Sequence, residues 1–209
     1  MQSQHQKKCY VIVITSLTKI CRQMTANIPD EIPSSLPDAE KLYANLLEQV
    51  RSAIARKPSL QVVGLASGGA WIAKRIAKDL GLETFGVINV SFHRDDYAEK
   101  GTKALNTEEG LSTSLPFEVD GAHIILIDDV LDTGRTVRAA LNEIFDYGRP
   151  AKVELAVLAD RYRRELPVEA SFRGARVDLA QNQILVLEQL PDGRFDFNTE
   201  SKNHPSNVV

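Results

Sequence analysis

Two adjacent acids and the short turn that follows them are the residues of this chain best suited to chemistry. Asp128 and Asp129 follow the apolar run 124–127, and the turn 132–136 leads into a helical pattern. Carboxylates at the end of a buried strand can accept hydrogen bonds from neighbouring hydroxyls, and a turn at a helix N-terminus offers backbone N–H groups to a phosphate. A sugar phosphate presents both groups, so the segment predicts a sugar-phosphate site.

The turn combines small, hydroxyl-bearing and charged side chains. It consists of Asp132, Thr133, Gly134, Arg135 and Thr136. In the simplest alternative, the two preceding acids only end a strand, and Asp132 or Thr133 only caps the helix, a role that such residues often fill. That alternative explains a helix cap but not two consecutive acids after a buried strand.

The elements that must position these residues alternate between strands and helices. Residues 39–56 place apolar side chains four apart, as an amphipathic helix does. The glycine loop Ser67-Gly68-Gly69 follows a short β-rich run and opens a second helical pattern. The strand-like runs lie within 61–65, 83–92, 123–127, 152–159 and 184–187, and the other helical patterns cover 70–80 and 136–147.

The strand-like runs are apolar throughout and do not alternate with polar residues. This pattern predicts an α/β fold with a mainly parallel sheet that is flanked by helices on both faces. In such folds ligands bind at the carboxyl ends of the strands, which is where the acids and the glycine loop lie. The polar stretch 93–116 is far longer than an ordinary connection and predicts a lid.

Length and composition predict one soluble domain. The chain has 209 residues, of which 43% are hydrophobic and 25% charged. We place the domain at 25–197, with an unstructured tail over 1–24, in which Met24 is an alternative start, and a frayed C-terminus over 198–209. A net charge of -3 excludes a global basic field for nucleic acid but not a local patch. Both cysteines lie near the start, and no apolar run is long enough for a membrane span, so we expect a cytoplasmic protein.

Residues 124–136 resemble the phosphoribosyl-pyrophosphate signature of type I phosphoribosyltransferases. That signature begins with four apolar residues, two acids and two more apolar residues. It ends with an acidic or polar residue, Thr, Gly, a basic or polar residue, and Thr. The resemblance implies that Asp128 and Asp129 hold the ribose hydroxyls and that 132–136 holds the 5-phosphate. It makes these acids and Asp132 the catalytic candidates. It also implies that Mg²⁺ neutralises the pyrophosphate leaving group and that the glycine loop binds this group.

A flexible hood that closes over the substrate is a further feature of that family. The residues here that resemble it are Arg94, Asp95 and Asp96, at the start of the long polar stretch. In the family the hood keeps water away from the reactive ribosyl centre. We therefore expect Arg94 to reach the pyrophosphate.

Four segments resemble the pyrimidine-operon attenuation regulators that double as uracil phosphoribosyltransferases. The resemblance implies transfer of the phosphoribosyl group to N1 of uracil, which yields uridine monophosphate (UMP) and pyrophosphate, in a homo-oligomer. It places the base near Asp160, Arg161 and Val186. In the regulators a basic pair helps to grip an mRNA leader, and the matching residues are Arg163 and Arg164. The segments are 72–75, 92–96, 134–140 with 146–150, and 155–161 with 164–167.

Two departures from that family leave other functions open. Ala66-Ser67-Gly68 stands where well-known members have Lys-Thr-Arg, and the missing charges leave open a UMP-sensing regulator with little or no catalysis. Asp132 stands where Tyr is common, and an acid there resembles the hypoxanthine and guanine phosphoribosyltransferases, in which it contacts the purine ring. The C-terminal strand lacks the Gly-Tyr-x-Leu-Asp run by which those purine enzymes frame their base. The sequence therefore favours uracil over a purine.

The two arginines matched to RNA binding have a simpler alternative role. Arg163 and Arg164 can neutralise the phosphates of a transcript. They can equally form salt bridges with Asp160 and Glu165, which are close to them in the sequence.

Overall fold

The computed structural model describes residues 36–90 and 112–201, which belong to one compact unit, Ile32–Val209. The expected hood residues Arg94, Asp95 and Asp96 and the expected tail 1–24 lie outside the described residues. Along the chain, the helices and strands are α2 (Ala39–Arg56), β1 (Gln61–Leu65), α3 (Gly68–Leu80), β2 (Gly86–Ile88), β3 (His123–Leu131), α5 (Arg135–Tyr147), β4 (Lys152–Asp160), β5 (Phe172–Arg176), β6 (Gln183–Gln189) and β7 (Phe195–Ser201).

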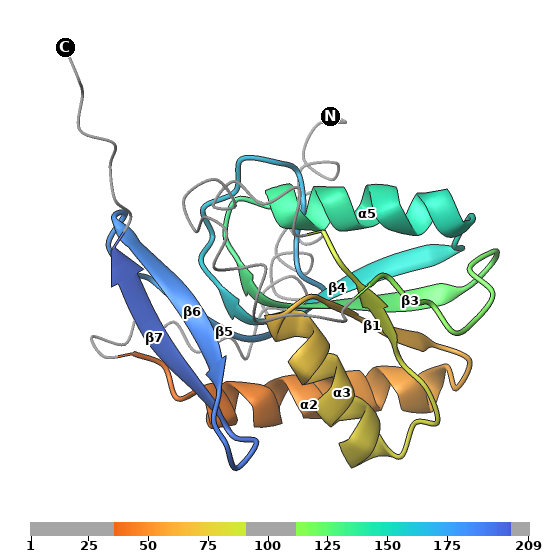
Figure 1. Ribbon diagram of the computed structural model, residues 1–209, viewed down its shortest axis with the longest axis horizontal. Helices are drawn as coiled ribbons and strands as arrows, with labels where there is room; N and C mark the ends of the chain where they lie inside the picture. Colours follow the sequence, from red (N-terminus) through yellow and green to blue (C-terminus); the bar gives the residue numbers. More distant parts are fainter. Residues whose placement is uncertain (1–35, 91–111, 202–209) are drawn as a thin grey trace, which may run out of the picture. The chain divides into compact units, whose positions relative to one another are not determined.

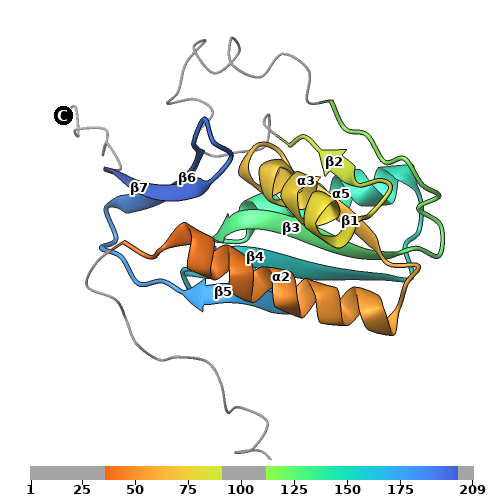
Figure 2. The ribbon, with the colours of Figure 1, turned by 90° about the horizontal axis from the view of Figure 1, so that it is seen from below.

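Five of the strands form a parallel sheet in the order β2-β1-β3-β4-β5. Helices α2 and α3 cover one face and α5 covers the other (Figures 1 and 2). This arrangement confirms the predicted fold class. Each helix buries one side against the sheet and has a polar side facing away from it. Within the described residues no helix is long and apolar enough to cross a membrane.

The two faces of the sheet carry separate parts of the core, and strand β3 contributes to both. Ile125 and Ile127 pack into the cluster beneath α2 and α3. Ile124 and Leu126 pack into the cluster beneath α5. Because successive side chains of a strand point to opposite faces, a strand covered on both sides must be apolar at every position. This is the physical reason for the continuous apolar runs in the sequence.

Strands β6 and β7 form a separate antiparallel pair. A cluster of charged and aromatic side chains connects β7 to the helices α2 and α3. The carboxylate of Glu40 accepts two hydrogen bonds from Arg75, at 2.6 and 2.8 Å, and one from the N–H of Phe195 at 2.7 Å. The Arg75 guanidinium also lies over the rings of Tyr43 and Phe195, 4.2 and 5.0 Å from their centroids. Mainly through the hydrogen bond from Arg75, the pKa of Glu40 lies below its ordinary value.

Several element boundaries differ from those expected. Of the strand expected over 83–92, the described residues form only β2, Gly86–Ile88, and residues 91–92 lie outside them. Two other differences lengthen a strand. Strand β3 continues through the acid pair to Leu131, past the expected end at residue 127, because its backbone keeps pairing with β4 as far as Leu131 and Asp160. Strand β7 runs to Ser201, so the expected start of a frayed end at Asn198 is wrong: residues 198–201 pair with β6. In both places pairing with another strand extends order beyond the apolar residues.

Candidate active site

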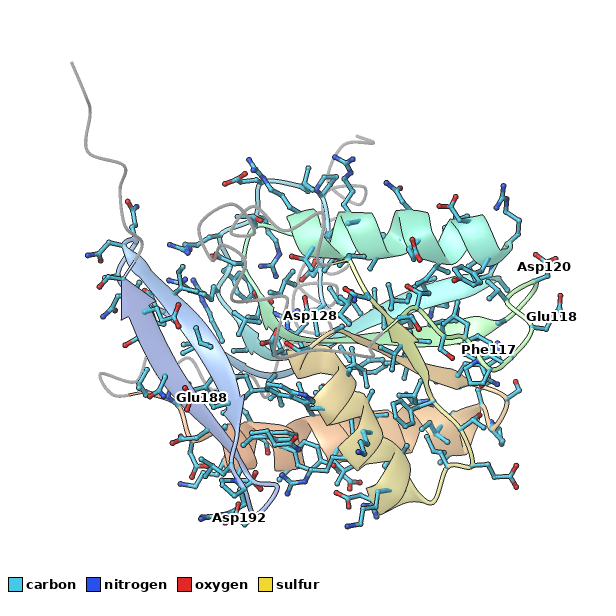
Figure 3. All side chains as sticks on the ribbon, viewed as in Figure 1. Phe117, Glu118, Asp120, Asp128, Glu188 and Asp192 are labelled. Atoms are coloured by element: carbon cyan, nitrogen blue, oxygen red, sulfur yellow. The ribbon has the colours of Figure 1, made fainter. Side chains whose placement is uncertain are left out.

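The acid pair, the glycine loop and the turn before α5 all lie at the carboxyl edge of the parallel sheet. The glycine loop follows β1, the acid pair lies near the end of β3, and residues 161–166 follow β4. In Figure 3, Asp128 lies far from the labelled residues Phe117, Glu118 and Asp120, which precede β3. The structure therefore brings together segments that the sequence separates by up to about a hundred residues, as parallel sheets do.

The backbone holds both carboxylates of the acid pair. Asp128 is only 3% exposed, and its Oδ1 accepts a hydrogen bond from the N–H of Asp129 at 3.0 Å. The Oδ1 of Asp129 accepts one from the N–H of Val130 at 2.9 Å. A backbone hydrogen bond thus helps to orient each carboxylate. The pair sits within β3 and does not follow it, so the strand itself positions both acids.

The glycine loop packs directly against the acid pair. A Cβ atom on Gly68 would lie 2.5 Å from Oδ2 of Asp129, and one on Gly69 would lie 2.3 Å from the carbonyl oxygen of Ile127. With the Asp129 side chain in its present orientation, only glycine fits at both positions. The peptide bond between Ala66 and Ser67 is cis, and the Ser67 side chain makes no capping hydrogen bond to α3. The start of α3 and the carboxylates of β3 therefore form one continuous surface.

The turn before α5 places at the Ncap position a glycine, which has no side chain to cap the helix. This residue is Gly134, which has a φ of 92° and whose Cβ, if present, would lie 2.3 Å from a methyl group of Val168. The Thr133 hydroxyl accepts a hydrogen bond from the N–H of Arg135 at 3.3 Å. Of the two capping candidates in the simplest alternative, Thr133 contacts a helix N–H, whereas the Asp132 side chain is bound to Arg163. A helix N-terminus with adjacent hydroxyls is suited to an anion.

Asp132 points instead toward two arginines of the segment after β4. Arg163 donates from Nε to Oδ1 at 2.8 Å and from Nη2 to Oδ2 at 2.5 Å, and Arg161 lies 3.4 Å from Oδ2. Arg161 is 5% exposed and also donates to the carbonyl oxygen of Gln183 at 2.7 Å. Burial lowers the pKa of Arg161, although Asp132 opposes this effect, whereas the hydrogen bond to Asp132 raises the pKa of Arg163.

The remaining charges of this segment form other ion pairs. Arg164 donates to both oxygens of Asp160, at 2.6 and 2.7 Å, and Asp160 is fully buried. Glu165 pairs with Arg135 of the turn at 2.7 Å. Of the salt bridges expected from the sequence, the one between Arg164 and Asp160 is therefore confirmed, whereas Arg163 pairs with Asp132 and not with a neighbour in the chain.

The residues expected around the base are less closely grouped. Asp160 is enclosed by its ion pairs, Arg161 is buried between the turn and residues 179–183, and Val186 is half-buried on β6. The sequence missed the contact between Asp132 and Arg163, which are 31 positions apart. No local pattern marks such a pair, because only the pairing of β3 with β4 brings the two loops together.

Comparison with known proteins identifies the family. The model of the phosphoribosyl transferase domain matches residues 31–184. The chain belongs to the phosphoribosyltransferase family. This membership confirms the resemblance seen in the signature, and the protein is a phosphoribosyltransferase.

Curated relatives and solved structures agree with this assignment. The chain is 53% identical over 170 residues to the bifunctional protein PyrR of Ralstonia nicotianae. The aligned residues cover 79% of this chain and 95% of that protein. The chain is 42% identical over 168 residues to the bifunctional protein PyrR of Nitrosococcus oceani, covering 77% and 90%. A hypoxanthine-guanine phosphoribosyltransferase from Bacillus anthracis is 18% identical with a TM-score of 0.54, covering 75% of this chain and 88% of that one, which shows a shared fold.

Proposed function

We propose that this phosphoribosyltransferase transfers the phosphoribosyl group of phosphoribosyl pyrophosphate to N1 of uracil, releasing UMP and pyrophosphate. The observation that carries the proposal is the contact between the glycine loop and the acid pair, in which Gly68 approaches the carboxylate of Asp129 too closely for any side chain. A substrate that carries pyrophosphate on C1 beside two ring hydroxyls would meet both features at once. The similarity to bifunctional PyrR proteins supports uracil as the base.

The described residues would act mainly by positioning and by electrostatics. Asp128 and Asp129 would accept hydrogen bonds from the ribose hydroxyls, and their negative charge would favour the positive charge that develops on C1 as its bond to pyrophosphate breaks. The N–H groups at the starts of α3 and α5 would hold pyrophosphate and the 5-phosphate. The bond from C1 to N1 of uracil would then form on the face opposite the leaving group.

Magnesium fits this site as an ion shared between the substrate phosphates and the acid pair. Among the described residues, no group of three or more His, Cys, Asp or Glu side chains could hold a metal. Mg²⁺ in phosphate-transfer sites is usually bound by one or two carboxylates together with substrate phosphates, which Asp128 and Asp129 could supply. When bound, it would neutralise charge on the pyrophosphate.

The environment of Asp132 supports a pyrimidine and not a purine. In the purine enzymes this acid contacts the purine ring, but here the guanidinium of Arg163 lies across both oxygens of the carboxylate. We place uracil near Arg161 and Val186, with Asp160 acting through its ion pairs with Arg164 and Arg173. A hypoxanthine or guanine phosphoribosyltransferase is the alternative.

We propose a second role, UMP-dependent binding of an mRNA leader by a cytoplasmic homo-oligomer, on the basis of similarity to proteins named bifunctional. Arg163 and Arg164 are its candidate contacts, but both are engaged by carboxylates, so they would have to exchange partners. Binding of a leader transcript with and without UMP, measured across salt concentrations, tests this role. No binding at physiological salt, or an affinity that does not change with salt, would contradict it.

The catalytic proposal is tested by pyrophosphate release from phosphoribosyl pyrophosphate and Mg²⁺ with each nucleobase in turn. We expect release with uracil and none with hypoxanthine or guanine. Turnover of a purine would replace the proposal by the purine alternative. Binding of UMP without turnover of any base would favour a regulator with little or no catalysis.

A further inference from the structure

A carboxylate lies within the turn that would bind the 5-phosphate, and this is electrostatically unfavourable unless the charge is compensated. Asp132 directly precedes Thr133, and its side chain is 25% exposed. Two negative charges a few ångströms apart repel each other strongly where water is partly excluded. An uncompensated Asp132 would therefore weaken the binding of any phosphate at the start of α5.

Arg163 compensates this charge with a geometry that a mobile surface cation would not provide. Its guanidinium meets both oxygens of Asp132 side by side, with distances of 2.8 and 2.5 Å. Such paired contacts fix the orientation of the carboxylate as well as its charge. Arg161 adds a second, more distant contact at 3.4 Å.

The backbone holds the arginine segment against the turn. The N–H of Arg161 donates to the carbonyl oxygen of Leu131 at 2.9 Å, and the N–H of Glu165 donates to that of Thr133 at 3.0 Å. These bonds flank Arg163 on both sides, so its position depends on the turn itself. The segment after β4 and the turn after β3 therefore behave as one unit.

We propose that Arg163 is a positioning residue for phosphoribosyl pyrophosphate: it neutralises and orients Asp132 so that the turn 132–136 can hold the 5-phosphate. The inference rests on the proposed function, because it assumes that this turn binds the phosphate of that substrate. It gives Arg163 a role in substrate binding that does not depend on RNA.

The test compares Arg163→Gln with the wild-type protein by calorimetric binding of phosphoribosyl pyrophosphate with Mg²⁺ and by steady-state kinetics. Removing the compensating charge should weaken binding roughly tenfold and raise KM for this substrate by a similar factor, with a smaller change in kcat. The effect should shrink as salt is added, because salt screens the repulsion. Arg163→Lys keeps the charge but not the paired contact, so its affinity for phosphoribosyl pyrophosphate should lie between those of the wild type and Arg163→Gln.

A double-mutant cycle separates charge compensation from direct contact with the phosphate. In an Asp132→Asn background no carboxylate needs compensation, so adding Arg163→Gln should change the affinity by less than about twofold. Arg176→Gln is the matched control, since Arg176 is exposed and contacts the Tyr162 ring, with its guanidinium 4.5 Å from the ring centroid. It removes the same charge from the neighbouring surface and should leave the affinity unchanged. Melting curves identify any variant that loses its fold.

Two results would overturn the inference. One is that Arg163→Gln binds phosphoribosyl pyrophosphate with wild-type affinity. The other is that Arg163→Gln lowers this affinity by the same factor whether residue 132 is Asp or Asn. A wild-type protein that binds no phosphoribosyl pyrophosphate would instead refute the proposed function. The two failures are therefore distinguishable.

Discussion

Replacing Gly68 by alanine separates the stability of the glycine loop from its part in the active site. The added Cβ would lie 2.5 Å from Oδ2 and 2.7 Å from Cγ of Asp129. Oδ2 and Cγ can rotate away, and Cβ of Asp129, at 3.0 Å, must yield by only a few tenths of an ångström. The fold should therefore survive the substitution, while the carboxylate moves out of its position.

The neighbouring Gly69 is the matched comparison, because its Cβ would meet backbone and not side chain. That atom would lie 2.3 Å from the carbonyl oxygen of Ile127 and 3.0 Å from Cα of Asp128, so α3 and β3 would have to separate. Overpacking of this kind costs about 1–3 kcal/mol. For a chain of this size the melting temperature should fall by roughly 2–12 °C. For Gly68→Ala we expect a stability change within about 1 kcal/mol, the size of the helix preference of alanine over glycine.

Activity should respond differently in the two variants. A shift of about 1 Å in a group that orients substrate can lower the rate about 100-fold, which is the loss we expect for Gly68→Ala. Pyrophosphate release and thermal melting, measured on the same preparations, give the two quantities. Gly68→Ala with activity within twofold of wild type would refute the role of the Asp129 contact. A loss of stability as large as that of Gly69→Ala would refute the argument that the side chain can move.

Three further predictions concern single residues. Asp128→Asn and Asp129→Asn should each lower pyrophosphate release at least about 100-fold with near-native melting curves, and retained activity would refute their assignment to the ribose. Because the hydrogen bond from Arg75 holds the folded-state pKa of Glu40 below its ordinary value, the ion pair stabilises the protein above that ordinary value. This stabilisation is lost as the pH falls through the folded-state pKa. On acidification the melting temperature of wild type should therefore drop more than that of Glu40→Gln, and parallel curves would contradict this. Arg164→Gln should cost about 1–3 kcal/mol in denaturant unfolding, because the buried Asp160 loses its two shortest side-chain hydrogen bonds. Asp160 keeps the N–H of Tyr162 at 2.9 Å and the guanidinium of Arg173 at 3.8 Å, so its charge is not left uncompensated. Unchanged stability would show that the pair is not needed.

Features that depend on local pattern were predictable from the sequence. The helix over 39–56 has the expected bounds, because its apolar spacing and the Asp38 cap are both local. The strands that are buried on both faces, β1, β3 and β4, were each located, since burial demands a continuous apolar run. Strands β5 and β7 were not predicted. Strand β5 has the sequence Phe-Arg-Gly-Ala-Arg and lies at a sheet edge, and β7 is mostly exposed, so neither has that signal.

The signature 124–136 determined by itself that a sugar phosphate was the ligand to expect, because adjacent acids and a Thr-Gly turn carry that chemistry in their order along the chain. Tertiary structure alone decided which partners those residues have. The order of the strands places Gly68 against Asp129, and Arg163 against Asp132. Contacts between segments far apart in the chain depend on how strands pair and not on local composition. For that reason the role of Asp132, ambiguous in the sequence, became interpretable only once its arginine partners were visible.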